Sequence, residues 1–291
     1  MPSEPSELSG LRQASRRSRF LHDYERRLRG RHSAPLLLSH GALLLRVTRN
    51  ELRAKYAGSL LGFGWLIVAP LLFLTLYAAV ILFVYRLQPV GLTREQYVLY
   101  IVTGLVPYLV IAESVSAGVS SVVANKSILA NVVFPIDLVP AKAVLAAQPT
   151  MIVGTAIIVV GVVATDTINW TMALFPVVFV LQTMALIGAT WILSLLNIVL
   201  RDLTHIMATL LLIMLVASPI AYTPDQVPSR LKWLLVINPF SYFVVAYQEI
   251  WVLGRVPTPP QIIGLLTVSF GLFFGGGWFF ARAKRALLDY V

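Results

Sequence analysis

The sequence predicts an all-α integral membrane protein with six transmembrane helices, an amphipathic helix on the inner surface and short re-entrant helices on the outer side. Hydrophobic residues make up 58% of the chain and charged residues 12%, against about 25% charged residues in soluble domains. Six apolar stretches are each long enough to cross a bilayer, which takes about 20 helical residues. These stretches are Tyr56–Tyr85, Gln96–Asn125, Ala143–Thr165, Thr167–Leu200, Leu203–Pro224 and Val256–Ala281.

The basic residues between the stretches lie mostly on one side. If the chain begins in the cytoplasm, six spans return its end there, and 18 of the 23 Lys and Arg residues face inward. The five that face outward are Arg86, Arg94, Arg230, Lys232 and Arg255. Cytoplasmic loops of membrane proteins carry the excess of Lys and Arg. We therefore expect a multi-pass protein of the bacterial inner membrane with both termini in the cytoplasm.

The composition also excludes several classes of protein. A formal charge of +10 usually suggests nucleic acid, but here most of it lies on the inner face, where anionic lipid and a partner protein are the natural counter-charges. We expect no nucleic-acid partner. The absence of cysteine excludes disulfides, thiolate metal sites and cysteine nucleophiles. The first 35 residues are polar and Arg-rich, unlike a signal peptide.

The segments before the first span divide into a tail and a helix. Residues 1–35 have too little apolar content to fold alone and are predicted to form a basic cytoplasmic tail. Residues 40–56 place apolar side chains on one stripe and arginines on the adjoining face, which is typical of a helix lying in the membrane interface. Gly58 and Gly62 then allow the chain to turn into the bilayer.

Two connections between spans contain more than a simple turn. In the inner connection 125–137 and just beyond it, Pro135 and Pro140 are expected to interrupt any continuous helix and leave a short helical piece parallel to the membrane. The outer segment, defined here as Tyr222–Pro260, divides at Asn238–Pro239 into two amphipathic pieces that are too short to span. Backbone of that kind is tolerated at membrane depth only within protein or beside a cavity.

No pattern typical of catalysis occurs. The chain lacks a Walker-type phosphate loop, GxxxxGK followed by Ser or Thr, and so has no nucleotide site of that class. No metal site is expected. Glu113 is the only acid well inside a span, where a carboxylate costs about 2.5–3.5 kcal/mol on insertion scales. Two interpretations are open: a residue that lines the lumen or moves protons, or a carboxyl packed with Ser114, Ser116 or a neighbouring span.

Aromatic residues provide the other candidates for a functional site. Most of the 14 Phe, 11 Tyr and six Trp are expected to lie in the membrane interfaces. Some lie deep in spans or cluster in the outer segment, where a flat ring with one polar atom suits a sugar ring. Anchoring in the interface is the alternative for each. Together with Glu113, the candidates for the channel and outer end are Tyr77, Tyr108, Tyr222, Tyr242, Tyr247 and Trp251.

The order of these parts resembles the membrane subunit of type 2 ABC exporters, in particular the permeases that export O-antigen, capsular polysaccharide or teichoic acid. The resemblance covers the chain from about residue 40 onward and leaves the first 35 residues outside. It rests on ‘VTRNELRAKYAGSLLGFGWLIVAPL’, ‘ANKSILANVVFPIDLVPAKAV’, ‘NIVLRDLTHI’ with ‘SPIAYTPDQVP’, and ‘INPFSYFVVAYQEIW’.

The resemblance implies a fold and partners. Residues 36–291 would be a type 2 exporter transmembrane domain, in which 40–56 is the interface helix, 125–137 the coupling loop and 225–252 the periplasmic gate. Two copies of the chain would form a channel above two ATPase subunits, and a lipid-linked polysaccharide would pass through it. ATP and Mg²⁺ would bind the ATPase, so that this chain would need no cofactor and would not be an enzyme. The residues implied in ATPase coupling are Arg49, Arg53, Asn125, Lys126 and Asn131.

Two other functions remain as alternatives. Within the same class, the chain would export capsule, teichoic acid, a drug or a small lipid, since channel width cannot be derived from the sequence. In a different class, it would be a membrane enzyme acting on polyprenyl phosphate. Such an enzyme needs clustered acids, histidines or arginines at the membrane surface, whereas Glu113, Asp137 and Asp202 lie in separate parts of the sequence.

Overall fold

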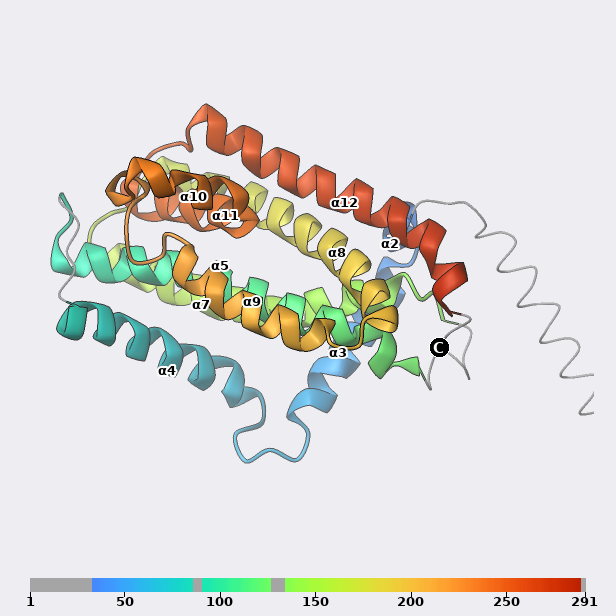
Figure 1. The fold of residues 1–291 in the computed structure, drawn as a ribbon. Helices are drawn as coiled ribbons and strands as arrows, with labels where there is room; N and C mark the ends of the chain where they lie inside the picture. The colour runs from blue at the N-terminus through green and yellow to red at the C-terminus, as the bar shows by residue number, and fades with distance from the viewer. Residues whose placement is uncertain (1–32, 86–90, 127–133, 289–291) are drawn as a thin grey trace, which may run out of the picture.

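A computed structural model describes residues 33–85, 91–126 and 134–288, and all regular structure in these ranges is helical. Most of the predicted basic tail, Asn131 and the middle of the predicted coupling loop lie outside the described residues. The long helices run side by side along one direction (Figure 1). The elements are α2 (Ser33–Ser39), α3 (Gly41–Tyr56), η1 (Gly62–Gly64), α4 (Trp65–Ala79), η2 (Val80–Tyr85), α5 (Arg94–Ala124), α7 (Leu138–Ala164), η3 (Trp170–Leu174), α8 (Phe175–Val199), α9 (Leu203–Ala217), η4 (Pro224–Gln226), η5 (Ser229–Leu231), α10 (Lys232–Ile237), α11 (Pro239–Gln248), η6 (Glu249–Leu253) and α12 (Pro259–Leu288).

Within the described ranges, five helices are long and apolar enough to span a membrane, one fewer than the sequence predicted. The predicted fifth span, Leu203–Pro224, forms only the 15-residue helix α9. At 1.5 Å per residue α9 is about 22 Å long, shorter than a hydrocarbon core of about 30 Å. Helix α9 ends because Ser218 precedes Pro219 and adopts an extended conformation, with ψ of 141°.

Helix α5 forms the centre of the molecule. Of its most apolar window, 78% is buried inside the protein, and the helix contacts α7, α8 and α11. A capping box formed by Thr93 and Gln96 starts it. Helix α12 packs along α8, where a side chain at Gly188 would overlap the backbone of Leu272. Helix α4, with 22% of its window buried, lies at the edge of the bundle opposite α12 (Figure 1).

Three local expectations are confirmed and one is wrong. Helix α3 covers the segment predicted as helical before the first span, and Gly58 and Gly62 both have positive φ in the turn that follows. The outer segment is broken at Asn238, as predicted. Helix α7, however, begins at Leu138 rather than Ala143, because Pro140 lies in its first turn, where a backbone N–H is unpaired anyway.

Candidate transport and coupling sites

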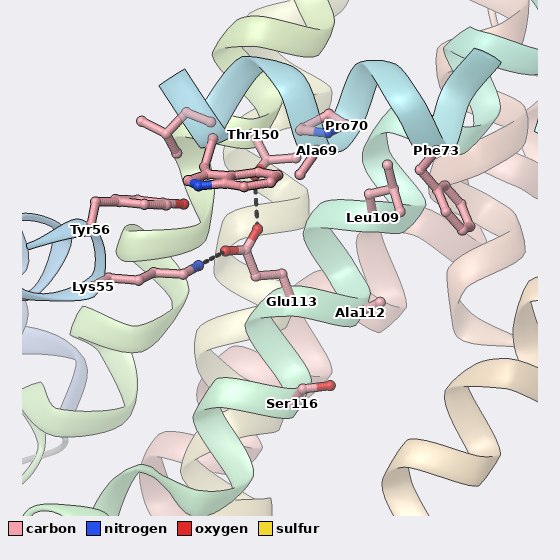
Figure 2. Close-up of a pocket in the computed structure, with 12 residues that line it drawn as sticks. Lys55, Tyr56, Ala69, Pro70, Phe73, Leu109, Ala112, Glu113, Ser116 and Thr150 are labelled. Carbon is pink, nitrogen blue, oxygen red and sulfur yellow. Dashed lines mark hydrogen bonds and ion pairs between the residues drawn. The ribbon is translucent and has the colours of Figure 1, made fainter. Parts of the chain in front are cut away.

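A cavity of about 610 Å³ lies between α3, α4, α5 and α7. Its wall is largely apolar and includes Trp65, Pro70, Phe73 and Leu109. The Glu113 carboxylate from α5 lies at its centre, and the side chains of Lys55 and Thr150 converge on it (Figure 2). A cavity of this size is within the range of small-molecule sites, about 300–1,000 Å³.

The charge of Glu113 is matched inside this cavity. The Nζ of Lys55 lies 2.5 Å from one carboxylate oxygen, and the hydroxyl of Thr150 donates to the other at 2.8 Å. Burial lowers the pKa of Lys55, but its hydrogen bond and ion pair with Glu113 outweigh burial, and the pKa is raised above 10.5. Of the two interpretations of Glu113, the packed and hydrogen-bonded carboxyl agrees with these contacts, but the partners are Lys55 of α3 and Thr150 of α7 rather than Ser114 or Ser116.

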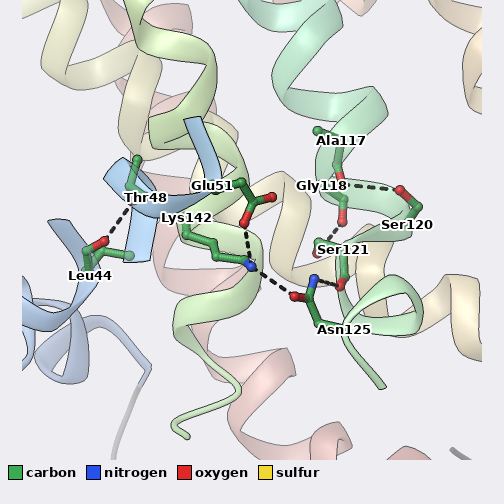
Figure 3. A network of polar contacts seen from close by, with 9 residues as sticks. All are labelled: Leu44, Thr48, Glu51, Ala117, Gly118, Ser120, Ser121, Asn125 and Lys142. Carbon is green, nitrogen blue, oxygen red and sulfur yellow. Dashed lines mark hydrogen bonds and ion pairs between the residues drawn. The ribbon is translucent and has the colours of Figure 1, made fainter. Parts of the chain in front are cut away.

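A second group of polar side chains joins α3 to the end of α5 and the beginning of α7 (Figure 3). Lys142, on α7, has a side chain only 8% exposed; its Nζ lies 2.5 Å from Glu51 of α3. The same Nζ donates to the side chain of Asn125 at the end of α5, at 2.9 Å. An ammonium group buried to this degree requires such partners. The predicted interface helix is therefore tied to the helices on both sides of the predicted coupling loop.

A third group surrounds Asp137, which immediately precedes α7, and joins this position to α2 and to α12. Asp137 is 1% exposed and accepts hydrogen bonds from Ser33 at 2.6 Å and from Lys284 at 2.8 and 2.9 Å. The indole of Trp191 donates to its backbone carbonyl at 2.9 Å. Asp137 precedes α7 but does not cap it, since its carboxylate is engaged by α2 and α12. We call this group, together with Lys142 and its partners, the inner clamp.

The predicted coupling residues surround this clamp but differ in their roles. Arg49 and Arg53 are exposed on α3, and Lys126 is exposed just beyond α5. Their free positions leave them available to a partner subunit. Asn125 is half-buried and already holds Lys142. The implied role of these residues in ATPase coupling stays a prediction.

Several predicted channel tyrosines use their hydroxyl groups inside the protein. Tyr108 donates to the carbonyl of Leu211, and Tyr222 to that of Ala217, at 2.7 Å. Tyr97 and Gln248, which are not among the residues predicted from the sequence, donate to the carbonyls of residues 219–221. Leu211 lies within α9, whereas the acceptors from Ala217 to Ala221 lie where the backbone leaves that helix. Backbone groups freed at membrane depth need such donors.

The remaining predicted aromatics are distributed over the outer half. Tyr247 is fully buried, and its hydroxyl donates to Gln182 at 2.8 Å. Trp251 is 5% exposed and packs edge-on against Phe175. Tyr77 stacks on Phe73, on the cavity side of α4. The hydroxyl of Tyr242 donates to the carbonyl of Val236 across the break in the outer segment. Contact of these rings with a sugar stays a prediction.

Comparison with known protein families identifies the family to which this chain belongs. Residues 42–251 match the family described as ABC-2 type transporter, which is more than half of the chain. The chain belongs to that family. The family consists of membrane components of transporters, so the chain is a multi-pass membrane protein and a transport subunit.

Named relatives align over most of the chain. It is 28% identical over 258 residues to the O-antigen export system permease protein RfbA of Myxococcus xanthus, covering 88% of this chain and 97% of that protein. A protein of the same name from Klebsiella pneumoniae is 27% identical over 217 residues, covering 74% and 82%. A further K. pneumoniae protein of that name is 26% identical over 215 residues.

Proposed function

We propose that this chain is the permease subunit of an ABC exporter that moves an O-antigen-type, lipid-linked polysaccharide across the bacterial inner membrane. The observation that supports this most strongly is the alignment with an O-antigen export permease over 97% of that relative's length. Two copies of the chain form the pathway, and two separate ATPase subunits supply ATP hydrolysis with Mg²⁺. The chain itself binds no cofactor.

The inner clamp provides a physical route for the energy of ATP. An ATPase that pushes on the predicted coupling loop acts on the start of α7, which immediately follows it. There Lys142 is bound to α3 and α5, and Asp137 to α2 and α12. A displacement at the loop is thus shared by the helices of the inner half, rather than absorbed by bending of one connection.

The cavity around Glu113 is suited to the lipid carrier of the polysaccharide. It combines an apolar wall with one ion pair. The apolar wall would accommodate the chain of an amphipathic lipid carrier, while the Lys55–Glu113 pair, whose charges cancel, offers no free cation for its phosphate. The outer segment forms the gate on the other side, with Tyr242, which is partly exposed, as the predicted aromatic side chain nearest to the passing glycan.

Deleting the gene for this chain in its bacterium tests the proposal. We expect loss of surface polysaccharide and accumulation of lipid-linked glycan in the inner membrane, both reversed by a plasmid copy. Surface glycan should be measured by gel and sugar analysis of washed cells. Unchanged surface glycan in the deletion strain would refute the proposal. The purified chain should hydrolyse ATP only when its ATPase subunit is added.

A further inference from the structure

A second pocket, of about 330 Å³, lies in the outer half, apart from the Glu113 cavity. It is bounded by η4, by Tyr100 of α5, by the junction of α11 with η6 and by Arg255. Its volume is at the lower end of the range for small-ligand pockets, about 300–1,000 Å³. It therefore has room for a compact polar ligand rather than for a lipid chain.

Two polar side chains in the wall of this pocket are almost completely buried. Gln248 is 0% exposed and Glu249 is 1% exposed. The Nε2 of Gln248 donates to the carbonyls of Pro219 and Ile220 at 3.0 and 3.1 Å, while its Oε1 has no partner among the described residues. The Oε1 of Glu249 accepts from Arg255 at 3.0 and 3.1 Å, while its Oε2 likewise lacks a partner.

These two unpartnered oxygens are costly. A buried acceptor without a hydrogen bond costs about 1–3 kcal/mol, and native structures contain few of them. Burial also raises the pKa of Glu249 above 4.5, although the charge and the hydrogen bond of Arg255 oppose the shift. Both side chains would gain from a ligand that brings hydroxyl donors into the pocket.

The mouth of the pocket presents groups of matching chemistry. Asp225, Gln226 and Arg255 are exposed there. A carboxylate, an amide and a guanidinium are planar groups that accept or donate two hydrogen bonds in one plane. Two adjacent hydroxyls on a sugar ring can form the complementary pair of hydrogen bonds with such a group.

We propose that this pocket is a subsite for a single sugar ring of the exported glycan on the outer side of the membrane, with Glu249, Gln248 and Arg255 as its principal contacts. The inference rests on the proposed function and adds to it a site within one protomer. A ring held there would hinder return of the chain between successive pushes from the inner side. Loose, repeated binding of this kind suits a polymer that must keep moving.

The absence of cysteine from the chain provides a direct test. In the purified transporter, Gln226→Cys places a thiol at the pocket mouth, and Ser229→Cys is the control at an exposed position nearby. The probes are monosaccharides obtained by acid hydrolysis of the surface glycan of the same bacterium, each tested separately. We expect at least one of them to slow alkylation at position 226 severalfold and to leave position 229 unaffected. Polyethylene glycol of equal osmolality controls for crowding.

Further variants separate this inference from the proposed function. Arg255→Gln and Glu249→Gln should each abolish the protection of position 226 and lower glycan export per folded permease. Asp225→Asn should also lower glycan export per folded permease. Because Asp225 is exposed, this substitution is not expected to affect folding. If no sugar slows alkylation at position 226 while the wild-type chain exports glycan, the subsite is refuted and the transport function stands. If deletion of the gene leaves surface glycan unchanged, the transport function fails, whatever the labelling shows.

Discussion

The ion pair between Asp137 and Lys284 joins residues 147 positions apart, and removing one of its members should destabilise the fold strongly. Their side chains are 1% and 14% exposed, so neither charge is well hydrated. Removing one member of a buried pair costs about 3–5 kcal/mol, because the other charge is left uncompensated. In Lys284→Met the Asp137 carboxylate keeps only the hydroxyl of Ser33 among the side-chain donors described here.

This cost can be measured as a change in melting temperature of the purified protein in detergent. At about 2 °C per kcal/mol, the lower end for large chains, Lys284→Met should melt roughly 6–10 °C below the wild type. The double variant Asp137→Asn with Lys284→Met removes both charges and should recover part of the loss. We expect a coupling free energy within the range of about 0.5–3 kcal/mol seen for residues in contact.

A matched control is available on the same helix. Arg282 is exposed and lies over the ring of Trp278, with no carboxylate partner in the part of the chain that the structure describes. Arg282→Met should change stability by no more than about 0.5 kcal/mol, as surface substitutions usually do. If Lys284→Met melts no lower than Arg282→Met, or if the two substitutions at the ion pair are simply additive, the clamp does not act as described.

Three further predictions concern other sites. Reversing either charge of the Lys55–Glu113 pair should lower the amount of folded permease in membranes, and the double exchange Lys55→Glu with Glu113→Lys should restore much of it; equal loss in all three would argue against the pair. Because the folded state raises the pKa of Glu249, the melting temperature of the wild type should fall relative to Glu249→Gln as the pH rises above about 4.5, and parallel curves would contradict this. Membrane-impermeant maleimide should label a cysteine at Lys232 but not one at Lys126 in intact cells, and the reverse pattern would overturn the topology.

The features that were predicted correctly are determined by residues that lie close together in the sequence. Long apolar runs produced the five spans, positive φ at Gly58 and Gly62 produced the turn into the bilayer, and Asn238 before Pro239 produced the break in the outer segment. Each of these is governed by local geometry or by the length of a helix. The same local rule applies at Ser218 before Pro219, where it ends α9 before the apolar stretch ends.

The candidate site could be predicted only in part, because its chemistry depends on contacts between distant segments. Glu113 was selected as a costly acid, but its partner Lys55 is 58 positions away on a helix predicted to lie flat in the interface. Gln248 carries no pattern that distinguishes it from other polar residues. Its role is decided by the carbonyls that Pro219 leaves exposed, some 29 positions earlier.

The hydrogen bonds around the end of α9 have a mechanical consequence. Tyr97 of α5 and Gln248 at the end of α11 donate hydrogen bonds to the carbonyls of residues 219–221. These bonds fix the non-helical segment after α9 to α11 and to α5, the candidate span with the largest buried share among the described residues. Asn238 adds a bond from its amide to Ser218 at 2.9 Å. The outer half of one protomer should therefore behave as a stiff block. We expect a passage wide enough for a sugar chain to open by the parting of two such blocks, not by the swing of a flap within either one.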